Sequence, residues 1–430
     1  MLIEFTIENF RSIREQQTLS LVAKKNKEDK INHLISSPAL RRHQLVPAAT
    51  IYGANAAGKT NIIRAAATMQ QLIMLSAEQQ NIGEFWQPYL FSSSTRNAPT
   101  RFEVIFIHQG MRYQYGFSLD AQHVHEEYLY AYPRGNRHVW FEREWNPALG
   151  GGSDAYDWYF GPSLRGEKKR LAKLTRPNAL FLSVAALFNH KQLSVPFDWF
   201  ASRLRIALPP GLSGRGTPFL HITAELMEKD PRMRQRILSL MQDADFGIVD
   251  ITVEEEVIGK VIDKETLPSD MPDIVKRALL DLTFKNITLS HEGDEGEDVP
   301  LNFGQESAGT QRLFALAGPM LDVMREGRVL FIDELESSLH PLLAARIVRM
   351  FHNPRENTKG AQLIFNTHNT YLLGRKHLRR DEIWFVEKGG QDAATRLVPF
   401  LDYHPRKHEN RELAYLQGRY GAVPILGEAW

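Results

Sequence analysis

The sequence contains no cysteine, and this absence removes several kinds of site at once. A chain without cysteine forms no disulfides, binds no zinc through thiolates and uses no thiol nucleophile. No apolar run approaches the ~18 residues that a membrane-spanning helix needs, so we expect no membrane association. No basic region precedes an apolar one at the start, as it does in a signal peptide, and a cytoplasmic location is therefore expected.

The chain also lacks a charge imbalance, since 52 Lys and Arg residues face 51 Asp and Glu residues. This balance excludes a chain-wide basic field for nucleic acid, although a local basic patch stays open. Hydrophobic residues make up 43% and charged residues 24%, as is typical of a globular protein.

The length of 430 residues exceeds what one hydrophobic core usually holds, so we expect roughly two or three domains or lobes. Apolar residues alternate with period two in several segments up to residue 160, become helically spaced from about 164 to 244, and alternate again after 247. The pattern predicts an α/β fold whose parts are the start of a head (1–80), a β-rich part with two hairpins (81–160), a helical insertion (161–247), a return to strand (248–300) and the rest of the head (301–430).

A phosphate-binding loop is predicted at residues 53–61, "GANAAGKTN". Gly53, Gly58, Lys59 and Thr60 satisfy the pattern G-x-x-x-x-G-K-[ST], between an apolar strand and a helix. Glycines let the backbone wrap a phosphate, while exposed N–H groups and the helix N-terminus supply positive potential. Lys59 is expected to neutralise the β and γ phosphates, and Thr60 to ligate Mg²⁺. The predicted nucleotide-binding residues of this loop are Gly53, Ala54, Asn55, Ala57, Gly58, Lys59, Thr60 and Asn61.

A second apolar strand, in "VLFIDELESSLHP" (329–341), ends in two carboxylates. Side chains at the carboxyl end of such a strand point toward the phosphate site of an α/β sheet. Asp333 is therefore predicted to hold the Mg²⁺ ion, and Glu334 to polarise the attacking water.

Two further segments are candidates for the same site. "LIFNTHNTYLL" (363–373) begins with an apolar strand that ends at Thr367 and His368. His368 is predicted to reach the γ-phosphate. "ESAGTQR" begins an amphipathic helix upstream of the two carboxylates, and this position indicates the signature segment of an ABC-type ATPase, with Ser307 and Gly309 on the nucleotide. Ser307 is also a suitable helix N-cap, and that alternative stays open.

With these motifs, the sequence resembles the ABC-type ATPases of the SMC and RecF-like branch. The matching segments are "ENFRSI", "GANAAGKTN", "ESAGTQR", "FIDELESSLHP" and "FNTHN". Within that branch it is similar to the bacterial abortive-infection ATPases of the RloA and AbiLi type, through "PTRFEVIF", "RPNALFLSVAALFN", "DADFGIVDI", "RRDEIWFVEK" and "YLQGRYGAVP". The resemblance runs nearly end to end.

The resemblance implies an ABC-type P-loop head with an inserted β-hairpin region and a compact helical arm. It implies ATP and Mg²⁺ as ligands, and a homodimer or higher even oligomer that sandwiches ATP. Ser307 and Gly309 of one protomer would then complete the site of the other. Arg11 and Ser12 are implied as contacts to the base and phosphates, and Gln87 as a further Mg²⁺ ligand. The signature departs from L-S-G-G-Q at Ala308 and Thr310, which predicts slow turnover.

The implied function is that of an ATP-hydrolysing sensor or regulator in anti-phage defence by abortive infection, which controls a separate effector such as a nuclease. Two alternatives stay open. One is a RecF- or SMC-like DNA-repair ATPase that clamps DNA, and the other is a nucleotide-gated scaffold with little turnover. Nucleic acid also stays open as a partner, because residues 165–176, "RGEKKRLAKLTR", form the densest basic stretch.

Overall fold

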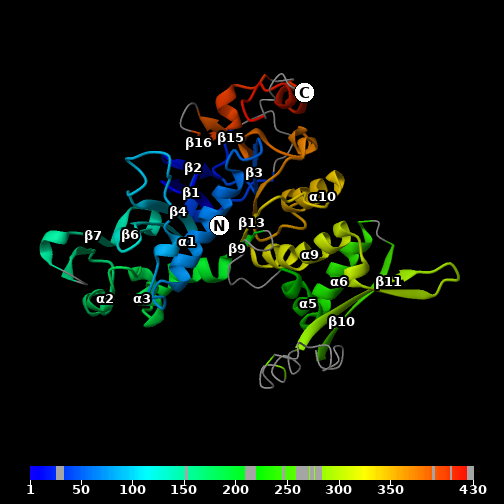
Figure 1. Ribbon diagram of the computed structural model, residues 1–430, viewed down its shortest axis with the longest axis horizontal. Helices are drawn as coiled ribbons and strands as arrows, with labels where there is room; N and C mark the ends of the chain where they lie inside the picture. The colour runs from blue at the N-terminus through cyan, green and yellow to red at the C-terminus, as the bar shows by residue number, and fades with distance from the viewer. Residues whose placement is uncertain are drawn as a thin grey trace. The chain divides into compact units, whose positions relative to one another are not determined.

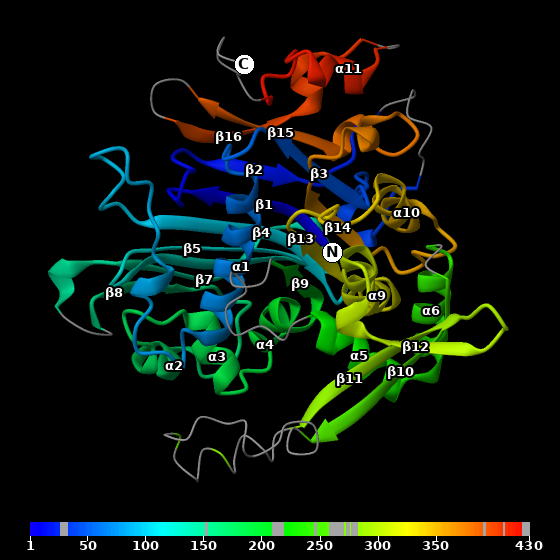
Figure 2. The same ribbon diagram turned by 45° about the vertical axis from the view of Figure 1, so that its right-hand side comes forward.

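The computed structural model describes residues 1–25, 33–150, 154–208, 219–244, 247–257, 271, 276, 283–389, 393–406 and 409–423. Backbone contacts divide the chain into two units (Figures 1 and 2). Unit 1 consists of Met1–Leu212, Val323–Glu336 and Ala344–Trp430, and unit 2 of Ser213–Asp322 and Ser337–Leu343. The predicted α/β fold class is confirmed.

Unit 1 contains an antiparallel sheet with the strand order β2-β1-β4-β5-β6-β7-β8. Hairpins join β4 to β5 and β6 to β7, as the alternating pattern predicted. The strands are β1 (Leu2–Glu8), β2 (Gln17–Ser20), β4 (Thr100–His108), β5 (Met111–Leu119), β6 (Val124–Tyr132), β7 (His138–Trp145) and β8 (Tyr156–Phe160).

The second sheet of unit 1 has the order β16-β15-β3-β14-β13-β9, and all its pairs except β15–β16 are parallel. Strand β3 from the N-terminal part lies between β14 and β15 from the C-terminal part, so the two ends of the chain contribute to one sheet. The strands are β3 (Ala48–Gly53), β9 (Leu204–Ala207), β13 (Val329–Ile332), β14 (Gln362–Asn366), β15 (Ile383–Gly389) and β16 (Ala394–Pro399).

Strand β9 corrects one prediction. Residues 164–244 were predicted to be helical, but Leu204–Ala207 pair in parallel with Val329–Ile332 and form an edge of the second sheet. This strand is only four residues long and follows the π-helical turn Trp199–Arg203 directly. Four residues are too few to show a hydrophobic periodicity in the sequence. The pairing with β13 therefore decides the conformation of this segment.

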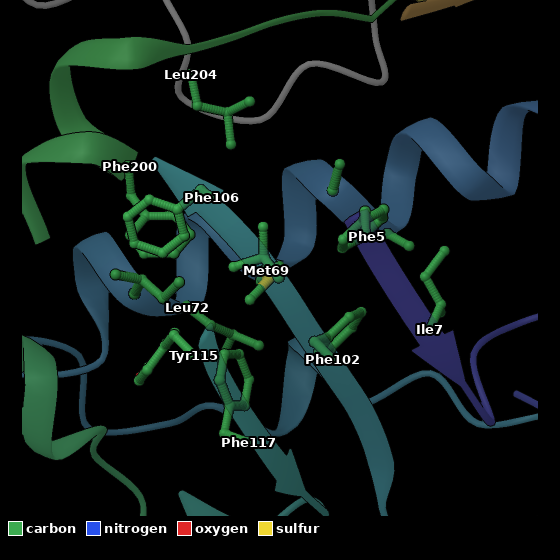
Figure 3. Close-up of a cluster of buried hydrophobic side chains, with 14 of the residues drawn as sticks. Phe5, Ile7, Met69, Leu72, Phe102, Phe106, Tyr115, Phe117, Phe200 and Leu204 are labelled. Carbon is green, nitrogen blue, oxygen red and sulfur yellow. The ribbon is translucent and has the colours of Figure 1, made fainter. Parts of the chain in front are cut away.

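The hydrophobic core of unit 1 lies between the inner face of the antiparallel sheet and helix α1 (Lys59–Leu75). Figure 3 shows Phe5, Phe102 and Phe117 from the sheet facing Met69 and Leu72 from α1. Burial of this many aromatic and aliphatic side chains fixes the start of α1, and therefore the loop before it.

The remaining helices of unit 1 include α2 (Lys168–Leu174), α3 (Phe181–Leu187), α4 (Ser194–Asp198), α10 (Pro341–His352) from Ala344 onward, and α11 (Arg411–Leu416). Helix α3 is held to the sheet by a buried ion pair: Arg143 Nε lies 2.9 Å from Glu127 Oε2, and Glu127 accepts hydrogen bonds from the backbone N–H groups of Phe181 and Leu182. The predicted helical insertion is therefore partly a layer packed on the β-rich region.

Unit 2 combines the antiparallel sheet β10-β11-β12 with α5, α6 and the first part of α9. Thr223 on α5 accepts a hydrogen bond from Gly318 N and donates one to Ala315 O, which fixes α5 against α9. The elements are α5 (Phe219–Lys229), α6 (Pro231–Gln242), β10 (Ile248–Val257), β11 (Thr283–Glu292), β12 (Asp298–Asn302) and α9 (Ala308–Glu326). Among the described residues, no helix combines the length and apolar character needed to cross a bilayer.

Candidate nucleotide-binding site

The loop at residues 53–58 has the backbone conformation that its glycines predicted. Gly58 caps the N-terminus of α1 with φ +110°, a left-handed value that L side chains rarely adopt. A Cβ at Gly58 would lie 2.1 Å from Thr395 Oγ1 and 2.8 Å from Ser12 Oγ. Gly58 therefore permits both the turn and the close approach of Ser12 and Thr395.

Lys59, the first residue of α1, is buried inside this loop. Its Nζ donates hydrogen bonds to Gly53 O at 2.8 Å and Ala54 O at 3.0 Å. Burial lowers the pKa of Lys59, while the carboxylates of Glu334, Glu336 and Asp333 act in the opposite direction. The lysine is thus held by carbonyl oxygens within the loop, close to three acidic groups.

Thr60 and Asp333 meet where β13 ends. Thr60 Oγ1 donates a hydrogen bond of 3.0 Å to Asp333 Oδ1. The same carboxylate oxygen accepts a hydrogen bond from Asn366 Nδ2, at the end of the adjacent strand β14. Asp333 is 2% exposed, so its carboxylate is fixed by these neighbours rather than by water.

Glu334 follows with an unusual backbone. Its φ of 53° lies in the left-handed region, which a non-glycine residue adopts only when its surroundings require it. Asn366 Oδ1 accepts a hydrogen bond of 2.5 Å from Glu334 N and so helps to hold this conformation. Asn366 thus contacts both of the acidic residues, Asp333 and Glu334. The Glu334 side chain is exposed, whereas Asp333 is buried.

His368 lies two residues beyond β14 and is exposed. Its backbone N–H donates a hydrogen bond to Glu336 Oε1. Burial of part of the ring and the nearby Lys59 charge lower the pKa of His368, against the attraction of Glu336 and Glu334. A lowered pKa leaves the imidazole neutral at physiological pH, so it can both donate and accept a hydrogen bond.

Arg11 and Ser12 adjoin the loop in the structure. Ser12 Oγ accepts a hydrogen bond of 2.7 Å from Asn61 Nδ2, and Arg11 Nη1 donates one of 3.4 Å to Asn61 Oδ1. Arg11 Nε donates a hydrogen bond of 2.5 Å to Oε1 of the Gln87 side chain. The role of Gln87 as a metal ligand stays a prediction.

The same residues line a hollow of about 720 Å³ beside the loop. Its wall is largely apolar and aromatic, and Leu90 and Phe91 are 64% and 81% exposed. The lining residues are Arg11, Ser12, Trp86, Gln87, Pro88, Leu90, Phe91, Arg96 and Asn97.

Ser307 and Gly309 belong to unit 2, at the start of α9. Ser307 Oγ accepts a hydrogen bond of 3.1 Å from Thr310 N and lies 2.8 Å from Thr310 Oγ1. Ser307 therefore has the N-cap geometry that the sequence left open, and it is exposed. A Cβ at Gly309 would lie 3.0 Å from Ser338 O, so this position leaves little room for a side chain. Their contact with nucleotide stays a prediction.

Sequence reasoning missed three residues of this site: Asn366, Glu336 and Thr395. Thr395 Oγ1 donates a hydrogen bond to Ala57 O at 2.8 Å, and its N–H donates one to Ser12 O at 2.7 Å. Asn366 carried the only usable sequence signal, because it is an amide at the end of an apolar strand next to His368. Thr395 gave none, since it lies far along the chain in an ordinary strand.

We expect the Asn366→Leu variant to lose roughly 10- to 100-fold in ATP turnover, the range found when partners of metal ligands are removed. The substitution removes the hydrogen bonds to Asp333 and Glu334 but leaves Lys59 in place. Nucleotide affinity, measured by fluorescence titration, should therefore change much less than the steady-state rate. Asn369→Ala is the control, because Asn369 caps the following turn through Tyr371 N. Equal rates for Asn366→Leu and wild type would contradict a positioning role.

The oxygen atoms of Thr60 and Asp333 form a donor set that fits Mg²⁺. A hydroxyl and a carboxylate 3.0 Å apart are hard ligands, and Mg²⁺ typically takes one or two carboxylates and completes its shell with water and phosphate oxygens. Within the described ranges, no cluster of three or more His, Asp or Glu side chains could hold a metal ion. Thr60 and Asp333 would hold the ion here, next to Lys59.

No curated protein matches this chain. Similar solved structures include an SMC head domain from Thermotoga maritima, with 14% identity over 93% of this chain and 98% of that one and a TM-score of 0.40. An SMC head bound to the C-terminal winged-helix domain of ScpA has 12% identity over 92% and 96%, with a TM-score of 0.44. An SMC head derived from Pyrococcus furiosus, with an extended coiled coil and bound to the C-terminal domain of ScpA, has 12% identity over 92% and 95%, with a TM-score of 0.42.

One protein family matches residues 49–374, well over half of the chain. Its description is "AAA domain, putative AbiEii toxin, Type IV TA system". The match begins in β3, just before the phosphate-binding loop, and ends after the His368 segment, so it includes Lys59, Thr60, Asp333, Glu334 and His368. The chain belongs to this family of AAA-domain proteins.

Proposed function

We propose that this protein is an Mg²⁺-dependent ATPase of the ABC type that acts in anti-phage defence and controls a separate effector protein. The observation that carries the ATPase part is the meeting of Lys59, Thr60, Asp333 and Glu334 at the carboxyl ends of β3 and β13. An α/β sheet binds its ligand at that edge. The finer assignment to the RloA and AbiLi type rests on the sequence resemblance.

The proposed division of labour follows from the contacts. When bound, ATP with Mg²⁺ supplies the phosphoryl group that is transferred to water. Lys59 exchanges its hydrogen bonds to Gly53 O and Ala54 O for bonds to phosphate oxygens. Glu334 orients the attacking water, and neutral His368 donates a hydrogen bond toward the transferred group. Asn366 keeps the two carboxylates in place.

The hollow beside the loop is the proposed site of the adenine base. It begins at Ser12, which approaches Gly58 closely, and its wall includes Trp86 and Phe91. Aromatic faces stack on a planar base, and Arg11 provides a positive charge at the phosphate end. This arrangement supports the predicted roles of Arg11 and Ser12.

A two-fold dimer completes the proposal, with Ser307 and Gly309 of each protomer acting on the nucleotide of the other. A closed symmetric pair is the common outcome for such self-complementary contacts. ATP binding would then form the dimer, and hydrolysis would open it. An effector could therefore distinguish the ATP-bound dimer from the open form.

The test is to purify tagged Glu334→Gln from its native host, with and without phage, and to identify what is present in stoichiometric amount. A small protein with a toxin-like or nuclease-like sequence would support the defence proposal. Host DNA with repair factors would favour the DNA-clamping alternative. A wild-type turnover equal to that of Glu334→Gln would favour the nucleotide-gated scaffold.

A further inference from the structure

Helices α2 and α3 lie side by side in unit 1 (Figures 1 and 2). They border a hollow of about 600 Å³. None of the residues that line it takes part in the nucleotide site. We call it the α2–α3 groove and define it by Arg170, Leu171, Leu174, Phe188, His190 and Lys191. It includes part of the basic stretch 165–176.

The floor of the α2–α3 groove is apolar and accessible. Leu174 is 49% exposed and Phe188 is 55% exposed, and the buried Leu171 lies between their helices. Apolar side chains that gather in a concave site, with polar groups around them, mark a binding surface more often than isolated exposed leucines do.

His190 forms part of the wall of the same groove. Its Nδ1 accepts a hydrogen bond of 3.2 Å from Leu193 N, so in the neutral ring the proton is on Nε2. His190 is only 8% exposed, yet within the described part of the chain Nε2 has no hydrogen-bond partner. It faces Gly166, where even a Cβ would come within 2.7 Å. Protein atoms cover Nε2, so a ligand in the groove does not reach this nitrogen.

The rim of the groove is positively charged. Arg165 and Lys191 line it and are exposed, and neither makes an ion pair with a described residue. Arg170 makes an ion pair of 3.2 Å with Glu167, but both side chains are more than 70% exposed, where such a pair contributes little. In a chain of net charge +1, this local excess of basic groups selects for an acidic ligand.

We propose that the α2–α3 groove binds an acidic amphipathic helix of a partner protein. Apolar residues of that helix would pack on Leu174 and Phe188, the two exposed apolar side chains of the groove. Further acidic residues would face Arg165 and Lys191. Helices bind apolar grooves in this way through residues at i, i+3 and i+7. Nucleic acid fits less well, because a phosphate backbone gains nothing from an apolar floor. The inference goes beyond the ATPase proposal and does not depend on it.

Site-specific photo-crosslinking in the native host tests the proposal on the full-length chain. p-Benzoylphenylalanine is placed at Leu174 or, as a matched control, at Leu187, which is 51% exposed but does not line the groove. We expect position 174 to capture one protein through a segment with acidic residues and helically spaced apolar residues, and position 187 to capture none. Capture of nucleic acid or a second copy of the chain, equal capture at both positions, or no capture would overturn the proposal.

The captured segment, made as a fluorescent peptide, then gives a quantitative test. Leu174→Asp and Phe188→Asp should each weaken its binding by about tenfold or more, since each removes one apolar contact worth about 1.4 kcal/mol. Leu187→Asp should change binding by less than about twofold, and thermal melts establish that each variant is folded. Unchanged binding in both groove variants would overturn the assignment of the site.

Discussion

The Lys59→Ala variant is expected to bind ATP at least about 100-fold more weakly than the wild type. Lys59 Nζ lies within the loop at 2.8 Å and 3.0 Å from two backbone carbonyl oxygens, and it is the ammonium group that phosphate oxygens would meet there. Charge-assisted hydrogen bonds contribute about 1.5–3 kcal/mol each, and two of them correspond to about 100-fold or more in affinity. Isothermal titration with ATP and with a non-hydrolysable analogue measures the loss directly.

Lys229→Ala is the control for this experiment. Lys229 is 72% exposed and pairs with Glu225 one helical turn away on α5, so its loss removes a charge of the same type without touching the loop. Far-UV circular dichroism should show that both variants are folded. Tight ATP binding by Lys59→Ala would contradict the assignment of residues 53–61 as the phosphate site.

The Glu334→Gln variant is expected to hydrolyse ATP at least about 100-fold more slowly while binding it as tightly as the wild type. Glutamine keeps the shape of the side chain and the backbone hydrogen bond to Asn366, but it cannot act as a base toward water. Positioned general bases typically contribute 10²- to 10⁴-fold. Steady-state phosphate release gives the rate, and light scattering with excess ATP should detect an ATP-dependent dimer in the variant.

Glu356→Gln serves as its matched control. Glu356 lies 3.2 Å from Arg346 in the same unit, outside the nucleotide site, so its replacement should leave turnover within about twofold. Unchanged turnover in Glu334→Gln would remove Glu334 from the proposed role. A slow variant that stays monomeric with ATP would leave the base assignment intact and contradict the ATP-sandwich dimer.

The local motifs were predictable because their information is local. The loop at Gly53–Thr60 depends on glycine conformation and on the start of a helix. Both are determined by residues that are consecutive in the sequence. The strand before Asp333 was predictable for a similar reason, since a run of apolar residues is buried on both faces of a parallel sheet. The hairpins of the antiparallel sheet followed from alternation with period two.

Thr395 and strand β9 were not predictable, and Asn366 had only its place at the end of an apolar strand as a signal, because each acquires its role from a distant partner. Asn366 contacts Asp333 and Glu334 only because β13 and β14 pair in one register. Thr395 reaches Ser12 and Ala57 only because β16 lies beside β15 at the edge of the second sheet. Four residues of β9 become a strand because β13 offers its free edge.

The sequence by itself therefore determined the α/β fold class of this protein and the residues that we predict to bind phosphate and metal. Only the tertiary structure decided which side chains hold those residues in place, and that the basic stretch 165–176 borders an apolar groove. The physical reason is the range of the interactions. Turn and helix preferences act between neighbouring residues, whereas strand register and side-chain packing join residues hundreds of positions apart.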